Sequence, residues 1–240
     1  MTRALTEFQV LTFDCYGTLI DWETGIWGAL QPLLMANGAT TPQRAEALTA
    51  FAEIQSAQEA ATPEMLYSRL LALVHNAFAR RFGLASTANL DTAFGASIPH
   101  WPAFPDSADA LRLLKRHFRL VILSNVDRDG FAASNRKLGV EFDAVYTAED
   151  IGSYKPDPRN FEYMLTRLQQ EMGLEKSAVL HTAQSLFHDH VQARAFRLAN
   201  AWIDRRRLAE GGDWGATLEV EERPHVDYRF PTLAAMAATL

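Results

Sequence analysis

The sequence predicts an α/β fold, with a parallel sheet covered by helices on both faces and an all-helical insertion after the first strand. Two observations predict it. From residue 102 onward, short apolar segments alternate with helical segments, and such alternation produces parallel sheets. Between residues 25 and 97, apolar residues recur at helical spacing and strand signals are almost absent. We therefore expect a core formed by residues 1–21 and 100–240 and a helical domain over residues 22–99.

The expected strands are short and apolar and are bounded by turn residues. The first is "FQVLTFDC", residues 8–15, which runs into a Gly-Thr turn and carries Asp14 near its end. The others are expected at 118–125, within 142–152, and at 177–183, 198–204 and 226–230.

The helices of the insertion are predicted from apolar spacing and from their end signals. The first, "GIWGALQPLLMANG", stops at Asn37-Gly38, a typical C-terminal cap. Thr41-Pro42 and Thr62-Pro63 are typical of an N-cap followed by the first helical residue, so we expect the next two helices to begin there. In the core, helices are expected at 105–117, opened by Asp106 or Ser107, and at 127–139, 156–173, 184–197 and after 231.

Composition excludes several classes of partner. The 240 residues carry a net charge of -6, which disfavours binding to nucleic acid, and the Arg205–Arg207 triplet is best explained as a solvated loop. Cys15 is the only cysteine, so no disulfide can form within the chain. No apolar run approaches the roughly 18 residues that span a bilayer, and the start of the chain lacks the apolar stretch of a signal peptide. We expect a cytoplasmic protein that acts on a small molecule, without nucleic-acid or membrane partners.

Polar residues gather where several expected strands end. Asp14, Ser124-Asn125, Lys155 and Gln184 lie at or just after such ends. Because ligands of parallel sheets bind beyond the carboxyl ends of the strands, we expect these residues to meet at one site.

Asp14 has two interpretations. It could simply close a turn or cap a helix. Alternatively it is a carboxylate nucleophile, oriented by Thr18 and kept ionised by Lys155, whose charge lowers the pKa of a nearby carboxyl group. Ser124 and Asn125 would then donate hydrogen bonds to a carboxylate or phosphate of the substrate.

Four motifs, "FDCYGTLID", "ILSN", "YKPDP" and "AQSLFHD", are similar in order and spacing to the four signature motifs of the haloacid dehalogenase superfamily. The resemblance implies a Rossmann-like core, a helical cap between the first two motifs, and a covalent intermediate on Asp14. The pattern "DxYGTL" resembles that of the 2-haloacid dehalogenase (type II) branch. Homodimers are common in this family, so a homodimer is possible.

Tyr16 and Gln184 distinguish among activities of the superfamily. Its phosphatases place a second Asp where this chain has Tyr16, and that Asp protonates the leaving alkoxide; halide needs no such proton. Gln184 replaces an Asp that binds magnesium in phosphatases, which removes charge that a hard cation prefers. We therefore expect no metal and no cofactor, or Mg²⁺ only if the protein is a phosphatase. By resemblance, Asp189 would position or activate the water that hydrolyses the intermediate.

Other positions depart from the dehalogenase pattern. Gln55 falls near a cap arginine that helps to bind halide, Phe161 replaces a tyrosine, and Gln184 and Leu186 replace a serine and an asparagine of the fourth motif. We expect Tyr16, Gln55, Phe161 and Gln184 to border the substrate. Three hypotheses remain open: an (S)-2-haloacid dehalogenase that uses Asp14, a phosphatase with a divergent first motif, and a non-catalytic binding protein.

Three histidines lie close together in the sequence, at His181, His188 and His190. A zinc site is not expected, because on a helix His188 and His190 point in different directions and His181 belongs to a strand. His188 can still reach the pocket.

Overall fold

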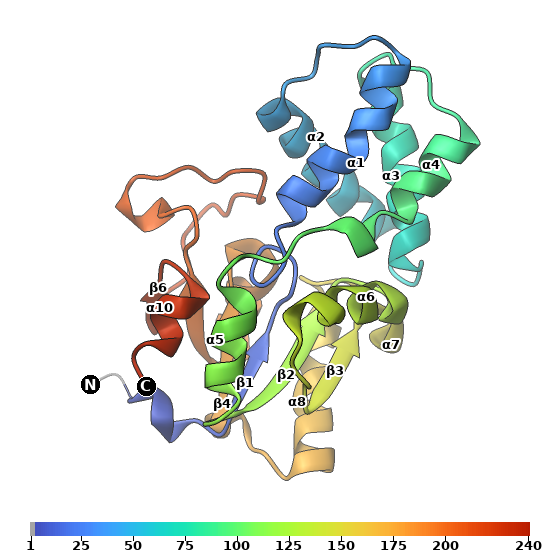
Figure 1. The fold of residues 1–240 in the computed structure, drawn as a ribbon. Coiled ribbons are helices and arrows are strands. Elements are labelled where there is room, and N and C mark those ends of the chain that lie inside the picture. The colour runs from blue at the N-terminus through green and yellow to red at the C-terminus, as the bar shows by residue number, and fades with distance from the viewer. Residues whose placement is uncertain (1–2) are drawn as a thin grey trace.

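The computed structural model describes residues 3–240 and contains a six-stranded sheet in the order β3-β2-β1-β4-β5-β6 (Figure 1). Every neighbouring pair of strands is parallel. The α/β fold with a helical cap is thereby confirmed. The strands are β1 (Val10–Phe13), β2 (Arg119–Ser124), β3 (Ala144–Thr147), β4 (Val179–Ala183), β5 (Ala199–Ile203) and β6 (Tyr228–Phe230).

Helices cover both faces of the sheet because successive strand residues point to opposite faces. Leu11 and Phe13 of β1 belong to one apolar cluster and Val10 to another, on the other face. The first cluster includes residues of α5, α6 and α10, and the second includes residues of α8 and α9. The core helices are α5 (Ser107–Leu114), α6 (Arg128–Leu138), α7 (Ala148–Ile151), α8 (Pro158–Met172), α9 (Val191–Ala195) and α10 (Leu233–Ala237).

The cap consists of four helices that lie beyond the carboxyl ends of the central strands (Figure 1). Buried apolar residues on α1, α2 and α3, among them Leu30, Phe51 and Leu70, join one core with Phe94 of α4. The bounds are α1 (Trp22–Ala36), α2 (Arg44–Ala61), α3 (Tyr67–Arg81) and α4 (Ala88–Gly95).

The predicted starts of the first three cap helices are wrong. Helix α2 begins at Arg44, and Thr41 does not cap it. Thr62 is the C-cap of α2, because the following Pro63 disfavours the helical conformation at Thr62. Its hydroxyl donates a hydrogen bond to the carbonyl of Gln58, four residues earlier. The first cap helix also starts earlier than residue 25: Asp21 caps it by accepting a hydrogen bond from the N–H of Thr24.

The segment expected as one helix over 184–197 is divided. Residues Leu186–His190 form a π-helical turn, which α9 continues, and Ser185 caps that turn by accepting a hydrogen bond from the N–H of His188. Such wide turns are rare and occur often at functional sites. This turn brings Ser185, His188 and Asp189 to the end of β4.

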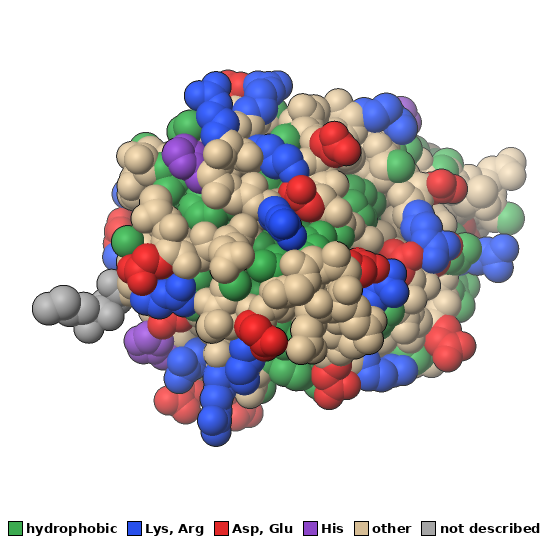
Figure 2. Space-filling view, turned by 90° about the horizontal axis from the view of Figure 1, so that it is seen from below, with side chains coloured by type: hydrophobic (Ala, Val, Ile, Leu, Met, Phe, Trp, Pro, Cys, Tyr) green, Lys and Arg blue, Asp and Glu red, His purple; other side chains and the backbone are tan. Residues whose placement is uncertain are grey.

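The surface opposite the cap carries basic and acidic side chains that are interspersed (Figure 2). Among the helices described by the structure, none has both the length and the apolar character required to cross a membrane.

Candidate active site

Asp14 follows the last residue of β1 at the rim of the sheet that faces the cap. Its carboxylate is almost fully buried and accepts hydrogen bonds from the Thr18 hydroxyl at 2.7 Å and the Lys155 ammonium at 3.0 Å. Gly17 permits the turn between Asp14 and Thr18, because its φ is +97° and a Cβ there would lie 3.1 Å from the Gln184 side chain. The turn thus brings the Thr18 hydroxyl into hydrogen-bond contact with the Asp14 carboxylate.

Lys155 is 1% exposed and connects three of the predicted site elements. Its ammonium donates to Asp14 Oδ1, to Asp189 Oδ1 at 2.7 Å and to the carbonyl of Leu123 at 3.0 Å. The side chain of Asn125 fixes the backbone of Lys155. Its Oδ1 accepts a hydrogen bond from the Lys155 N–H at 2.7 Å, and its Nδ2 donates to the Lys155 carbonyl at 2.9 Å. All three ammonium hydrogens are therefore used within the protein.

Asp189 is completely buried, and its two carboxylate oxygens have different surroundings. Oδ1 accepts from Lys155 and also from His181 Nε2 at 2.9 Å. Oδ2 is buried and has no hydrogen-bond partner among residues 3–240. An uncommitted buried carboxylate oxygen is uncommon and requires an explanation.

The charges of this cluster shift one another's pKa values. Burial raises the pKa of Asp14, as does the Asp189 charge, and the opposing effects of Lys155 and Thr18 do not reverse this. Burial acts upward on Asp189 as well, but Lys155 and His181 outweigh it and hold the pKa of Asp189 well below its usual range. Burial lowers the pKa of Lys155, but the two carboxylates have the larger combined effect, so the pKa of Lys155 lies above its usual value. Lys155 thus lowers the pKa of Asp14, as predicted, but burial has the larger effect and the net shift is upward.

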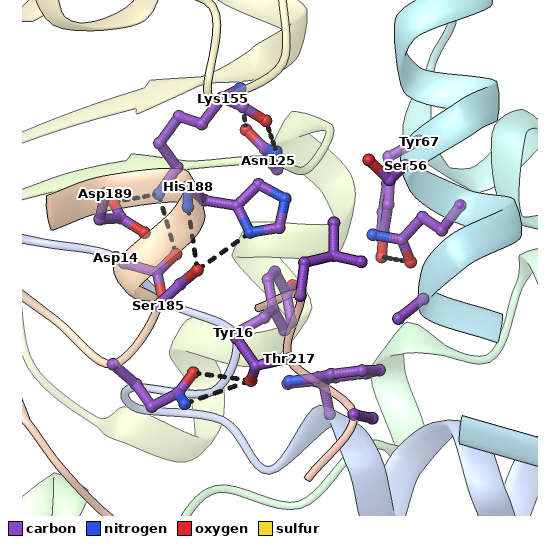
Figure 3. Close-up of a pocket in the computed structure, with 16 residues that line it drawn as sticks. Asp14, Tyr16, Ser56, Tyr67, Asn125, Lys155, Ser185, His188, Asp189 and Thr217 are labelled. Carbon is purple, nitrogen blue, oxygen red and sulfur yellow. Dashed lines mark hydrogen bonds and ion pairs between the residues drawn. The ribbon is translucent and has the colours of Figure 1, made fainter. Parts of the chain in front are cut away.

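A pocket opens between Asp14 and the cap (Figure 3). The pocket is lined by both domains. The cap contributes Trp22, Ala52, Gln55, Ser56 and Tyr67, and the core contributes Asp14, Tyr16, Asn125, Lys155, Gln184, Ser185, His188, Asp189, Ala216, Thr217 and Leu218. No arginine lies among these lining residues. Lys155, their only lysine, is already paired with two carboxylates.

The predicted substrate-contacting residues differ in where they lie. Tyr16, Gln55, Asn125 and Gln184 line the pocket. Ser124 does not; its hydroxyl is buried and has no partner in the described chain. The remaining candidate, Phe161, lies away from the pocket lining and is fully buried.

Phe161 packs its ring against His181, with ring centroids 4.9 Å apart, and stacks on Phe196. Tyr16 directs its hydroxyl to Ser134 at 2.9 Å. Gln184 directs its side-chain amide to the Thr217 hydroxyl, with contacts of 3.2 and 3.3 Å.

The residues around Gln184, which occupies a magnesium position of the fourth motif, do not fit that cation. Asp14 and Asp189 both bind the Lys155 ammonium, and the amide of Gln184 faces Thr217. Within residues 3–240, no three or more His, Cys, Asp or Glu side chains are grouped so that they could hold a metal ion. Mg²⁺ requires several free oxygen ligands in octahedral geometry.

His188 lines the pocket, as predicted, and pairs there with Ser185, which sequence reasoning did not assign. Burial lowers the pKa of His188 to about 4, so the imidazole is neutral at pH 7. Its Nδ1 lies 3.0 Å from the Ser185 hydroxyl, and its ring points toward the interior of the pocket (Figure 3). The capping pattern Ser185-x-x-His188 was the available signal, but it predicts a turn rather than a pocket.

The cap contributes a buried acid that the sequence also did not reveal. Glu59 on α2 is buried beside the pocket residue Gln55, whose amide donates to it at 3.0 Å. Tyr67 donates to the Gln55 carbonyl oxygen at 3.1 Å. Burial raises the pKa of Glu59 to about 8, so its side chain is a neutral acid at pH 7. The cap thus faces the pocket with neutral hydrogen-bonding groups.

Glu59→Gln is expected to stabilise the protein at neutral pH. The unfolded chain ionises near the ordinary value of 4.5, whereas the folded protein ionises only near 8, so Glu59 costs stability as pH rises between these values. Removing that ionisation should raise the free energy of unfolding by about 3 kcal/mol at pH 7 and change it little at pH 4. Urea unfolding at the two pH values measures the effect.

The control is Glu46→Gln, which replaces an exposed glutamate on the same helix. It should change stability by less than about 0.5 kcal/mol at both pH values. An equal gain in both variants, or a gain at pH 4, would contradict the assignment of a neutral Glu59.

Comparison with known proteins identifies the class. A family model described as haloacid dehalogenase-like hydrolase matches residues 8–181, more than half of the chain. The chain therefore belongs to the haloacid dehalogenase-like hydrolases, which confirms the family predicted from the four motifs. An (S)-2-haloacid dehalogenase 4A from Burkholderia cepacia is 28% identical over 170 residues, or 68% of this chain and 70% of that protein.

Solved structures share the fold with its cap. The L-2-haloacid dehalogenase of Xanthobacter autotrophicus with chloropropionic acid covalently bound superposes with a TM-score of 0.77 at 18% identity, over 96% of this chain and 97% of that one. A HAD hydrolase from Bacillus subtilis bound to magnesium has a TM-score of 0.75, also at 18% identity and with coverage of 96% and 97%. Because the fold is common to both, the activity has to be argued from the site.

Proposed function

We propose that this hydrolase is a 2-haloacid dehalogenase that acts through an ester of Asp14, without a metal or other cofactor. The observation that carries the proposal is the buried Asp14 carboxylate, held by Thr18 and Lys155 at a pocket where position 16 is a tyrosine. The Tyr16 hydroxyl is bound to Ser134, so it is not directed to a leaving group. This arrangement supports a carboxylate nucleophile and a leaving group that needs no acid at position 16, as halide does and an alkoxide does not.

In the first step, a carboxylate oxygen of Asp14 bonds to C2 of a short 2-haloalkanoic acid from the side opposite the halogen. The carbon–halogen bond breaks, and its electron pair leaves with the halide, which inverts C2. The backbone N–H of Tyr16, a pocket residue near Asp14, has no backbone acceptor in residues 3–240, and we infer that it donates to the substrate carboxylate.

In the second step, water attacks the carboxyl carbon of the Asp14 ester and releases the 2-hydroxy acid. We infer that Asp189, which lines the pocket and has one oxygen without a partner in residues 3–240, accepts a proton from this water. Lys155 lies between the two carboxylates and stabilises the negative charge that develops on the ester.

The departing halide would meet neutral groups. Gln55 lines the cap side of the pocket, but its amide is bound by Glu59 and Tyr67. Because no arginine lines the pocket, we infer that the leaving halide is stabilised by hydrogen bonds from neutral lining residues and not by a guanidinium.

Halide release decides between dehalogenase and phosphatase. With (S)-2-chloropropionate and excess EDTA, the purified protein should release chloride continuously, as followed by a halide electrode. Cleavage of p-nitrophenyl phosphate that depends on magnesium, without halide release, would instead support a phosphatase. If neither reaction occurs but small acids raise the melting temperature, the protein is a binding protein on this fold.

A further inference from the structure

Hydrogen bonds join Asp189 to two further buried side chains, His181 and Thr12. His181 on β4 is completely buried; its Nε2 lies 2.9 Å from Asp189 Oδ1, and its Nδ1 lies 2.9 Å from the hydroxyl of Thr12 on β1. His181 does not line the pocket and takes no part in either chemical step described above. Of its two hydrogen-bond partners, Asp189 is the one that lines the pocket.

The hydrogen bonds determine which nitrogen of His181 carries the proton. Asp189 has a strongly lowered pKa and can only accept, so Nε2 donates to it. The buried Thr12 hydroxyl has Nδ1 as its acceptor, the only acceptor for it in the described part of the chain. A neutral imidazole protonated at Nε2 satisfies both contacts.

Two donors consequently hold the same carboxylate oxygen. Asp189 Oδ1 accepts from His181 on one side and from Lys155 at 2.7 Å on the other, which fixes the rotation of the carboxylate. Oδ2 is left without a partner in residues 3–240. A carboxylate free to rotate could offer either oxygen to a proton, whereas here Oδ2 is the oxygen that remains uncommitted.

We propose that His181 is a positioning residue for ester hydrolysis, which holds Asp189 by Oδ1 so that Oδ2 receives the proton of the attacking water. The role rests on the proposed function. The water oxygen bonds to the Asp14 carboxyl carbon, and one water proton moves to Asp189 Oδ2. When the bond between that carbon and the product oxygen breaks, the proton passes to the product hydroxyl. The second water proton goes to solvent as Asp14 returns to its carboxylate.

Two variants of similar shape test this role. His181→Gln retains an N–H donor for Asp189, and His181→Met removes it. Halide release with enzyme in excess over substrate reports the first step, and product formation reports the second. In His181→Met, halide release should change by less than about 3-fold, whereas product formation should slow by about 10- to 100-fold. The Asp14 ester should accumulate and be visible as added mass on the intact protein, and His181→Gln should largely prevent this.

The experiment separates positioning from an effect on basicity. Loss of the His181 hydrogen bond removes one influence that lowers the pKa of Asp189, so a change in basicity alone would make Asp189 a better base and speed ester hydrolysis. Slower hydrolysis therefore supports positioning, and faster or unchanged hydrolysis overturns it.

Further controls address folding and the proposed function. His190→Gln replaces another buried histidine, bound to Ala183 and Asn200, and should lower stability without accumulation of the ester. If His181→Met does not fold, Thr12→Val carries the same test, because it removes the hydroxyl that fixes the His181 tautomer, and the ester should accumulate to a smaller extent. A native enzyme that releases no halide overturns the proposed function and the role of His181 together. Halide release by the native enzyme, with both steps equally slowed in His181→Met, overturns the role of His181 alone.

Discussion

Asp14→Asn is expected to abolish multiple-turnover halide release, with a loss on the order of 10⁴-fold or more, as for removal of other covalent nucleophiles. The amide is nearly the same size as the carboxylate but is a very weak nucleophile, so the first step should fail. The variant should still fold, because its oxygen can accept from Lys155 or Thr18 as the native side chain does. Steady-state kinetics with a halide electrode measure the loss, and circular dichroism checks the fold.

A surface variant and an isotope experiment complete this test. Asp129→Asn, at an exposed position of α6, should retain full activity. In a single turnover in H₂¹⁸O, the native enzyme should place the label in the Asp14 carboxylate, and the first product molecule should carry an unlabelled hydroxyl oxygen. Label in the hydroxyl of the first product, or repeated turnover by Asp14→Asn, would contradict an ester on Asp14.

The features of the fold that follow local rules could be predicted from the sequence. Alternating apolar segments gave all six strands, although β1 (Val10–Phe13) is shorter than the strand predicted over residues 8–15, so Asp14 follows the strand instead of lying within it. The misplaced helix starts have a common cause. Thr-Pro suits a helix start, but it suits a helix end equally, because the residue before proline is disfavoured from the helical conformation, and Thr62 closes the preceding helix.

The site could be predicted only where short motifs encode it. Asp14 and Lys155 are 141 positions apart in the chain, and a family resemblance combined with strand-end logic was enough to bring them together. Glu59 and His181 could not be found this way, because their importance arises from burial and from partners on other elements. Glu59 looks like an ordinary glutamate of a polar helix, and His181 like a strand residue. Their protonation states depend on the packed structure around them.

Lys155→Met is expected to cause the largest change in stability. Lys155 is the shared counter-ion of two buried carboxylates, and both lose it in this variant. Removing one partner of a buried ion pair leaves an uncompensated charge and typically costs about 3–5 kcal/mol. Halide turnover should fall with it, because no cation would remain beside the ester. Lys115→Met provides the control: Lys115 pairs with Asp143 at the surface, and exposed pairs contribute about 1 kcal/mol or less.

The dependence of stability on pH should reverse in the same variant. In the native protein the pKa of Asp189 is depressed, so its stabilising contribution is present above its unfolded pKa and is lost as pH falls through the folded value. Without Lys155, burial should raise the pKa of Asp189 above its unfolded value and raise the pKa of Asp14 further, because their largest opposing charge is gone. Stability would then be greatest in acid and fall as pH rises from about 4 toward 7. Urea unfolding across this range measures the slope, and Lys155→Met/Asp189→Asn should recover part of the loss at pH 7. A Lys155→Met protein whose stability increases with pH like that of the native enzyme would show that Lys155 is not what keeps these two acids ionised.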